Sequence, residues 1–348
     1  MQDLTIAVVG ATGAVGRKVI ELLEERNFPM KELRAFASFR SEGVKIPFNG
    51  EELTVHEAKP EGFIGADLVF FAAGGGTSKE LAPEAVKRGA VVVDKSSAWR
   101  MTPNVPLVIP EINGVDILEH EGIISSPNCS TIVLLMALAP LHRANPIKCV
   151  IVDTYQSASG AGGKAIAELF QQTRDTLEQK EPEHSTFPHT LAFNVLPHVE
   201  DFAGDGYTTE EIKMQDETRK IMHLPNLPVS ATCVRVPVPV SHSEAVHIEL
   251  THPITPQEAR EILAKAPGVI VQDDVAHNVY PLAQDATGKD EIFVGRIRRD
   301  LALENGLSLW TVGDNLRKGA ALNAIQIAEE LVARDCLKPR RKSGAAHS

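Results

Sequence analysis

A glycine-rich segment between a strand and a helix constrains the fold of this chain more than any other feature. The apolar run Leu4–Val9 predicts a strand, and Ala14–Glu25 predicts a helix because its apolar residues recur on one face. The segment between them has the spacing G-x-x-G-x-x-G. Glycines permit a tight turn, and a helix N-terminus offers unpaired N–H groups to a pyrophosphate. The pattern therefore predicts a dinucleotide site, and the alternative is a purely structural turn. The residues expected to contact the cofactor are Gly10, Thr12, Gly13, Ala14 and Val15.

Short apolar strands alternate with helical stretches through the first third of the chain. Residues 68–71 are apolar at every position, which is typical of a strand buried on both faces of a parallel sheet. Alternation of this kind predicts a doubly wound α/β domain. The further strands expected are Leu33–Ala37, Leu53–Glu57, Asp67–Ala72 and Ala90–Asp94, with a helix at Ser78–Arg88.

The end of the second strand indicates which cofactor binds. NAD sites usually carry an acidic residue there, which holds the ribose hydroxyls. This chain has Ser38, Arg40 and Ser41 instead. A guanidinium can pair with two oxygens of a 2′-phosphate, so the pattern favours NADP over NAD. The alternative is that Arg40 pairs with Glu42 in a solvated loop.

Composition limits the class of protein. The chain has 35 Lys and Arg against 46 Asp and Glu, a formal net charge of −11, which argues against nonspecific binding to nucleic acid or to an anionic membrane. The apolar run Ile132–Leu141 contains a proline and is too short to span a bilayer. The four cysteines lie far apart and form no C-x-x-C pair, so we expect neither disulfides nor a metal site. With a strand already at Leu4–Val9 we expect no signal peptide, and a cytoplasmic location.

Cys129 is the candidate nucleophile. It lies at the start of a predicted apolar helix over Ser130–Leu141, where the positive end of the helix dipole favours a thiolate. The same N–H groups, with the side chain of Asn128, could stabilise an oxyanion. Most unpaired cysteines are inert core residues, and Cys149 and Cys233 fit that description.

The rest of the chain predicts a second domain with mixed secondary structure. Its expected elements are strands at Cys149–Thr154, Ala231–Leu250 and Glu291–Leu303, a helix at about Glu210–Met222 and a final helix at Leu316–Ala333. Residues 171–190 are polar with two prolines and are interpreted as a surface excursion. His189 and His198, each beside a proline, are interpreted as structural.

Six motifs in this order resemble the aspartate-semialdehyde dehydrogenase family over the chain up to about Leu337. They are GATGAVG, SPNCST, TYQSASGAGGKA, CVRVPVPVSHSEAV, FVGRIRRD and GDNLRKGAALNAIQIAE. The resemblance implies NADPH-dependent reduction of L-aspartyl-4-phosphate to L-aspartate-4-semialdehyde, a step toward lysine, methionine and threonine.

The resemblance also implies the organisation of the chain. The expected parts are an NADP-binding Rossmann domain (1–128), an α+β catalytic and dimerisation domain similar to that of glyceraldehyde-3-phosphate dehydrogenase (129–315), a C-terminal helix that returns to the Rossmann domain (316–337) and a disordered tail (338–348). The implied assembly is a homodimer or a homotetramer.

Individual residues take their roles from the resemblance. Cys129 corresponds to the thioester nucleophile, His242 to the acid–base catalyst and Gln156 to the glutamine beside the thioester. Arg235 corresponds to the arginine that binds the substrate carboxylate, and Glu210 faces the substrate amino group.

The phosphate and the cofactor have their own residues. Arg100 and Lys213 correspond to the basic pair at the phosphate, to which we add Asn128. Trp99 stands where the family has phenylalanine, a difference expected to have no consequence. The further positions that contact the cofactor are Ser159, Gly160 and Asn315.

The sequence itself bears on three of these assignments. Arg235 lies between two valines in an apolar strand, and arginine is seldom buried without an anion nearby. His242 follows it by seven residues, so one unbroken strand would point the two side chains to opposite faces. The assignment therefore requires a break, which Pro237 and Pro239 favour. Glu210 and Lys213 are three apart on a helix and alone would be an ordinary surface pair.

Two other functions compete. An N-acetyl-gamma-glutamyl-phosphate reductase shares the architecture and the cysteine, but its substrate has no free amine for Glu210. A noncatalytic NADP-binding dimeric scaffold would have no need of Cys129, His242, Gln156 and Arg235 together.

Overall fold

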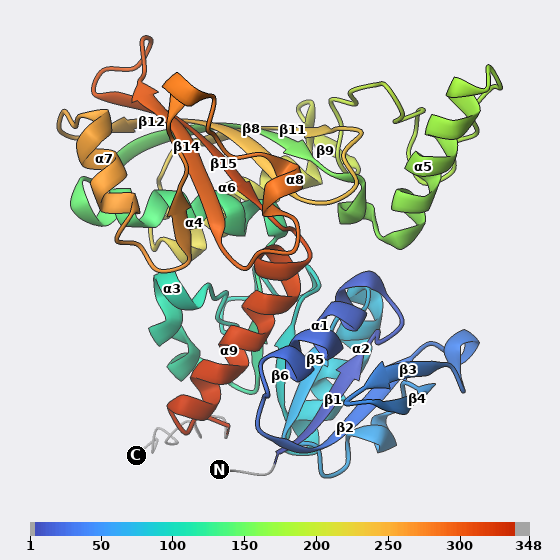
Figure 1. The fold of residues 1–348 in the computed structure, drawn as a ribbon. Helices are drawn as coiled ribbons and strands as arrows, with labels where there is room; N and C mark the ends of the chain where they lie inside the picture. Colours follow the sequence, from blue (N-terminus) through green and yellow to red (C-terminus); the bar gives the residue numbers. More distant parts are fainter. Residues whose placement is uncertain (1–3, 338–348) are drawn as a thin grey trace, which may run out of the picture. The chain divides into compact units, whose positions relative to one another are not determined.

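The computed structural model describes residues 4–337, which form two compact units. One unit contains the described residues up to Pro127 together with those from Asn323 onward, and the other contains Asn128–Leu322 (Figure 1). The two units are defined by their packing contacts, which do not show that either folds independently. The domain limits expected from the sequence therefore stay predictions. The predicted disordered tail, residues 338–348, lies outside the described residues.

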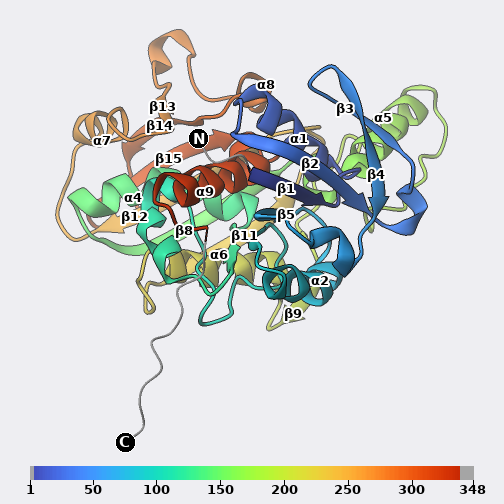
Figure 2. The ribbon, with the colours of Figure 1, turned by 90° about the horizontal axis from the view of Figure 1, so that it is seen from below.

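The N-terminal unit is built on a seven-stranded sheet with the order β3-β4-β2-β1-β5-β6-β7. Its pairings are parallel apart from the antiparallel pair β3 and β4. Strands β1, β5 and β6 are buried along their whole length, and helices α1 and α2 cover opposite faces (Figure 2). The predicted doubly wound sheet is therefore confirmed. The strands are β1 (Leu4–Val9), β2 (Met30–Ala37), β3 (Lys45–Phe48), β4 (Glu51–Glu57), β5 (Leu68–Phe71), β6 (Val91–Asp94) and β7 (Ile123–Ser125). The helices are α1 (Ala14–Glu25), α2 (Gly75–Lys87), α3 (Pro110–Asn113) and the 3-10 turns η1 (Phe39–Ser41), η2 (Pro60–Phe63) and η3 (Gly114–Glu119).

Strand β1 is the point where the strand order of this sheet reverses. The chain passes from β1 through α1 to β2 on one side, and β5 pairs with β1 on the other side. Ligands of doubly wound folds bind at the carboxyl ends of the strands at such a switch point. The glycine-rich segment that begins at Gly10 leaves β1 at that end.

The second unit is built on a six-stranded mixed sheet with the order β11-β8-β12-β15-β14-β13. Helices α4 and α6 pack against one face of it (Figure 1). The strands are β8 (Ile147–Gln156), β11 (Val229–Arg235), β12 (His242–Leu250), β13 (Val269–Val271), β14 (Ile292–Arg299) and β15 (Gly306–Gly313), with a separate pair β9 (Phe202–Gly204) and β10 (Tyr207–Thr208). The helices are α4 (Cys129–Ala144), α5 (Gly163–Leu177), α6 (Thr209–Ile221), α7 (Pro256–Leu263), α8 (Ala283–Ala286) and the turns η4 (Ala158–Ala161) and η5 (Val275–His277).

Helices α5 and α7 and strand β15 are among the elements of this unit that the sequence did not predict. Helix α5 takes in the first part of the segment interpreted as a surface excursion, which is therefore wrong for residues 171–177. Only Ala165, Leu169 and Gln172 of α5 are buried, so its apolar stripe is narrow and ends on a glutamine. Strand β15 shows the missed signal of alternating apolar residues, and α7 shows a capping box begun by Thr255.

The chain returns to the N-terminal unit through its last helix, α9 (Leu322–Ala333), after a π-helical turn η6 (Arg317–Ala321). Asn323 Nδ2 donates to the carbonyl of Val108 at 2.9 Å and to Ser126 Oγ at 3.0 Å. Arg26 makes two hydrogen bonds to the carboxylate of Glu329, at 2.7 and 2.9 Å. The predicted return of the C-terminal helix is confirmed.

The lengths and compositions of the helices bear on membrane insertion. No helix of residues 4–337 combines the length and the apolar character needed to cross a bilayer.

Phe63 tests the core of the N-terminal unit. Its ring is fully buried, and its centroid lies 5.8 Å from that of Phe36 and 6.1 Å from that of Phe71. Phe63→Ala should lower the free energy of unfolding by about 3–5 kcal/mol, because it removes buried area and leaves a cavity. The matched control is the neighbouring Ile64, which is 62% exposed, and Ile64→Ala should stay within about 0.5 kcal/mol. Urea unfolding followed by circular dichroism measures both, and equal losses would contradict the assignment of this core.

Candidate active site

Cys129 is the first residue of α4. Asn128 precedes it in extended conformation as the N-cap, and the first turn contains no acidic side chain. Residues 130–139 of the helix are buried, so α4 is held firmly and its N-terminus is presented to one place. Because a helix N-terminus carries partial positive charge, this position favours a thiolate on Cys129.

The backbone of η6 approaches the cysteine closely. Gly319, in this π-helical turn, lies so near that an added Cβ would sit 3.1 Å from Cys129 Cβ. Single π-helical turns are rare and often mark functional sites. A side chain at position 319 would therefore crowd Cys129.

His242 lies beside the sulfur, with its Nε2 3.3 Å from Cys129 Sγ. Strand β11 ends at Arg235 and β12 begins at His242, and Ser241 before it has a φ of 75°. The break that the sequence required between Arg235 and His242 is therefore present, and both side chains reach the same region. An ideal Cβ built on Gly160 would lie 2.8 Å from Arg235 Nη1 and 3.4 Å from the His242 ring.

The second imidazole nitrogen identifies the tautomer of His242. The peptide N–H of Ser157 donates to Nδ1 at 3.1 Å, and the Ser157 hydroxyl lies 3.2 Å from the same atom. Because a peptide N–H can only donate, Nδ1 is an acceptor here. The proton of the neutral ring is therefore on Nε2, which faces the sulfur.

Glu210 is a buried anion beside the cysteine, with 3% of its surface exposed. Its carboxylate accepts hydrogen bonds from Asn128 Nδ2 at 2.8 Å and Gln156 Nε2 at 3.0 Å. Burial acts to raise the pKa of Glu210, but the charge of Lys213 and these two hydrogen bonds outweigh it, so the pKa lies below its usual value. The carboxylate is therefore charged at neutral pH.

Arg235 supplies a buried cation, with 6% of its surface exposed. Its Nη1 donates to the carbonyl of Ser157 at 2.8 Å, and the guanidinium lies over the ring of Phe187, 5.7 Å from the centroid. These contacts hold the planar group in one orientation. A planar guanidinium held in this way can pair with a carboxylate through two parallel hydrogen bonds.

Lys213 has partners that the sequence did not predict. Its Nζ pairs with the carboxylate of Glu200 and lies 3.4 Å from a carboxylate oxygen of Glu210. The ammonium therefore sits between two carboxylates at the edge of the pocket.

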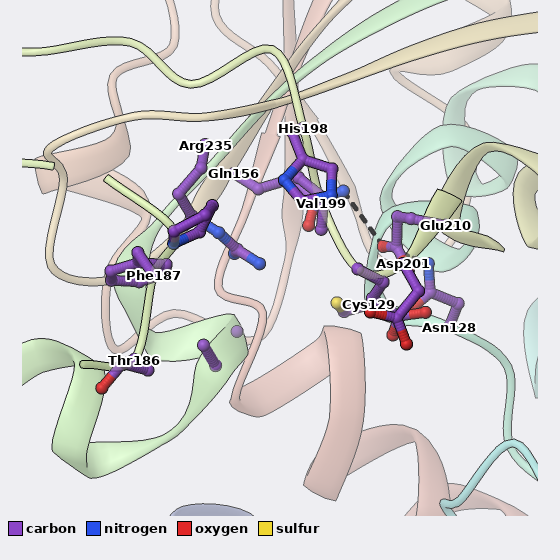
Figure 3. A pocket seen from close by; sticks show the side chains of 14 residues that line it. Asn128, Cys129, Gln156, Thr186, Phe187, His198, Val199, Asp201, Glu210 and Arg235 are labelled. Carbon is purple, nitrogen blue, oxygen red and sulfur yellow. Dashed lines mark hydrogen bonds between the residues drawn. The ribbon is translucent and has the colours of Figure 1, made fainter. Parts of the chain in front are cut away.

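Cys129, Glu210 and Arg235 line a pocket of about 440 Å³ (Figure 3), whose lining does not include His242 or Lys213. Arg235 and Phe187 lie on one side, and Cys129 and Glu210 lie on the other. Of the residues proposed from the sequence, the pocket lining includes Asn128, Cys129, Gln156, Gly160, Glu210 and Arg235.

Part of the lining was missed from the sequence. It consists of Thr186, Phe187, Pro188, His198, Val199, Glu200 and Asp201, together with Ala161. The surface-excursion interpretation is therefore wrong for residues 186–188, and His198 belongs to the pocket wall. Its ring stacks on Phe202 at 4.6 Å. These residues are placed by a small core that includes Leu169, Phe187 and Leu191, whose apolar members are too widely spaced to show as a periodic pattern.

Ser159 and Asn315 lie behind His242 and are both buried. Ser159 Oγ donates to Asn315 Oδ1 at 3.0 Å, and Ser157 Oγ donates to the same oxygen at 3.2 Å. The peptide N–H of Ser241 also donates to it, at 2.9 Å. Ser157, which the sequence did not single out, thus connects this network to His242.

The glycine segment of the N-terminal unit fits a dinucleotide pyrophosphate. Helix α1 begins at Ala14 with no side-chain cap and no acidic residue in its first turn, so its N-terminus is suited to bind an anion. Gly10 has a φ of 88°, and a Cβ there would meet the carbonyl oxygen of Ala72 at 2.7 Å. Thr12 Oγ1 lies 3.3 Å from Ser41 Oγ, which links the segment to η1.

Arg40 lies exposed in η1 after Ser38, with its guanidinium 5.8 Å from the Phe39 ring centroid. Glu42, the partner considered for it, instead accepts hydrogen bonds from His56 Nδ1 and the peptide N–H of Glu57. The arginine is therefore placed at the end of β2, where a cofactor ribose is expected.

Arg100 is buried in the same unit, and its Nη2 donates to the carbonyl of Lys95 at 2.9 Å. The loop around it is built on Asp94, whose carboxylate accepts hydrogen bonds from Ser78 and Ser96. Trp99 Nε1 donates to Ser78 Oγ at 2.9 Å. A phenylalanine could not make this bond, and the expectation that the tryptophan has no consequence stays a prediction.

Known proteins match both units. Residues 5–120 match the family model for the semialdehyde dehydrogenase NAD binding domain, and residues 138–318 match the semialdehyde dehydrogenase dimerisation domain. An aspartate-semialdehyde dehydrogenase of Aquifex aeolicus is 56% identical over 331 residues, 94% of this chain and 97% of that protein. One from Bacillus subtilis is 51% identical, over 95% of this chain and 98% of that protein.

A solved structure of an aspartate semialdehyde dehydrogenase also matches this chain. Aspartate semialdehyde dehydrogenase II of Vibrio cholerae, complexed with ASA, has a TM-score of 0.93 at 43% identity over 96% of this chain and 99% of its own. A nucleophile position, a dinucleotide loop and sequence identity over nearly the whole length therefore agree, and the chain belongs to the aspartate-semialdehyde dehydrogenase family.

Proposed function

We propose that this chain reduces L-aspartyl-4-phosphate to L-aspartate-4-semialdehyde with NADPH, through a thioester on Cys129. One observation carries the proposal: a buried cation, Arg235, and a buried anion, Glu210, share a pocket with Cys129. An α-amino acid presents a carboxylate and an ammonium, which these two charges match. The relatives named above carry the same activity in their names.

The geometry of the pocket also weighs against both competing functions. An N-acetylated substrate has no ammonium, so the charged carboxylate of Glu210 would be buried against a neutral amide, which is costly. A noncatalytic scaffold would not need a histidine 3.3 Å from the sulfur of a helix-terminal cysteine.

The first half of the reaction is acyl transfer to Cys129. The thiolate, accepting from His242 Nε2–H, attacks the acyl carbonyl, and N–H groups at the start of α4 stabilise the oxyanion. The C–O bond to phosphate then breaks and a thioester remains. Arg100 and Lys213 balance the charge of the departing phosphate, and Lys213 must exchange Glu200 for it.

The second half is reduction of the thioester. When bound, the reduced nicotinamide supplies a hydride, and Gly10, Thr12, Gly13, Ala14, Val15, Ser159, Gly160 and Asn315 are the residues proposed to hold the cofactor. His242 Nε2–H stabilises the oxygen of the resulting tetrahedral adduct and then the thiolate that leaves as the aldehyde forms.

We propose a homodimer formed through the second unit, which matches a dimerisation domain model. Successive residues of a strand point to opposite faces. The face of β8 away from α4 exposes Ile151 and Tyr155, and Tyr155 packs against Trp310 with ring centroids 5.3 Å apart. An exposed apolar sheet face of this kind suits an interface between subunits. The four free cysteines support a cytoplasmic location.

Phosphate-dependent reduction of NADP with L-aspartate-4-semialdehyde tests the proposed function directly. Cys129→Ala should lower this turnover by at least about 10³-fold, because no thioester can form. Binding of NADPH, measured by its fluorescence, should remain. Cys149→Ala is the matched control and should keep its activity, since Cys149 lies on β8 outside the pocket. Substantial turnover in Cys129→Ala would contradict the covalent mechanism.

Arg40 should determine the preference for NADP. In Arg40→Ala the KM for NADP should rise by the equivalent of about 1.5–3 kcal/mol, because a charge-assisted bond to the 2′-phosphate is lost. The KM for NAD should change little. Initial rates with both cofactors measure this, and equal losses would show that Arg40 does not contact the 2′-phosphate.

Arg235 and Lys213 should affect different substrates. Arg235→Lys keeps the charge but loses the planar fork, so kcat/KM for aspartate semialdehyde should fall at least about tenfold, roughly 1.4 kcal/mol. Its KM for phosphate should hardly change. Lys213→Ala should instead raise the KM for phosphate. Steady-state kinetics with each substrate varied in turn separates the two, and the reverse pattern would mean that the two anion sites are exchanged.

A further inference from the structure

We propose that the hydroxyl of Ser157 is the group that allows His242 to accept a proton, which makes Ser157 a positioning residue of the active site. The inference rests on the proposed function, because it concerns the base in aldehyde oxidation. Ser157 follows β8 and is fully buried, as is His242. Neither the motifs nor the pocket lining draw attention to it.

Two groups of Ser157 are hydrogen-bonded to His242 Nδ1. The peptide N–H is 3.1 Å away and can only donate. The hydroxyl oxygen is 3.2 Å away and can donate or accept. The peptide N–H therefore favours the tautomer with its proton on Nε2, which is the resting state described above.

The resting tautomer cannot act as a base toward the substrate. Its Nε2 already carries a proton and offers no lone pair to a hydroxyl group at the sulfur. For Nε2 to accept, the ring proton must lie on Nδ1, and a partner must accept that N–H. Of the two groups of Ser157 at Nδ1, only the hydroxyl can do so.

The surrounding network gives the hydroxyl two positions. When its hydrogen points to Nδ1, Ser157 Oγ donates to the neutral ring. When the hydrogen points to Asn315 Oδ1, 3.2 Å away, the oxygen is available to accept from Nδ1–H. Ser159 Oγ, 2.9 Å from Ser157 Oγ, offers a further partner. Because these side chains are buried, the exchange is one between protein groups.

The protons of aldehyde oxidation balance when the ring first takes up one proton from solvent at Nδ1 and holds it on Ser157 Oγ. The Cys129 thiolate adds to the aldehyde carbon, and Nε2–H of this imidazolium protonates the oxygen, which gives a hemithioacetal and a neutral ring with its proton on Nδ1. The hydroxyl proton then returns to Nε2 as the C–H hydrogen leaves as hydride, which an oxidised nicotinamide would accept, and the carbon remains bound to sulfur as a thioester. The imidazolium finally returns one proton to solvent.

Two other ionisable groups lie near the imidazole. Cys129 Sγ is 3.3 Å from its Nε2, and a Cβ added at Gly160 would contact both Arg235 Nη1 and the His242 ring. Neither of these is changed by a substitution at Ser157, so a serine variant isolates the contact at Nδ1.

Ser157→Ala tests the proposal because it removes the hydroxyl and keeps the peptide N–H. The kcat of aldehyde oxidation should fall at least about tenfold, a modest share of what a positioned acid–base group contributes. The KM for the aldehyde should stay within about twofold, and the kinetic isotope effect with aldehyde deuterated at the reacting carbon should increase. Ser157→Thr, which keeps a hydroxyl, should recover most of the rate. Ser243→Ala is the matched control, since Ser243 adjoins His242 in β12 but lines a different pocket from Cys129.

Two readouts need no cofactor. The rate at which iodoacetamide alkylates Cys129 should be the same in Ser157→Ala as in the unaltered chain, because the resting Nε2–H contact is kept. The ¹⁵N spectrum of His242, assigned by its loss in His242→Asn, should show the Nε2-protonated neutral ring.

Three results would overturn the inference. They are an unchanged kcat and isotope effect in Ser157→Ala, a loss of alkylation that parallels the loss of kcat, and a neutral His242 protonated on Nδ1 at rest. If the unaltered chain does not oxidise the aldehyde at all, the proposed function fails, and the ¹⁵N spectrum still decides the tautomer by itself.

Discussion

The carboxylate of Glu210 holds the catalytic unit together. It accepts hydrogen bonds from Asn128, which precedes α4, and from Gln156, which ends β8, while it belongs to α6 itself. A buried charge is tolerated only where nearby groups compensate it. The same anion that is proposed to recognise the substrate ammonium thus holds the residue before Cys129, the proposed nucleophile, and the proposed substrate-facing glutamine. In the proposed function, substrate binding and positioning of these residues therefore depend on one side chain.

The wall of the pocket depends on a second ionic contact. Lys213 pairs with Glu200, and Glu200 belongs to the segment that also carries His198 and Asp201 into the pocket lining. If Lys213 turns to an incoming phosphate, this segment loses one of its attachments. The proposed phosphate site and the proposed substrate site thus meet at the Lys213–Glu200 pair. The balance of charge there changes when a phosphate group binds.

Much of the fold is predictable because its signals are local. The glycine spacing after β1, the apolar runs of β5 and β6 and the stripe of α1 are each contained in a few residues, and these elements appear where the sequence places them. Cys129 and Arg235 stand out for the same reason, one by its place at a helix start and the other as an arginine among valines. Helix α5 and the lining residues 186–188 are missed because their apolar contacts come from segments far apart in the chain. Ser157 is missed because its importance depends on the direction of a peptide N–H, which no residue pattern encodes.

The π-helical turn behind Cys129 has a consequence for inhibitor chemistry. The backbone at Gly319 leaves little room for a methyl group beside the Cβ of the cysteine. The pocket that Cys129 lines also contains Gln156, Glu210 and Arg235. A covalent ligand that enters this pocket therefore shares it with a carboxylate and a guanidinium. Compounds that carry a small electrophile on an amino-acid-like anchor match these two charges.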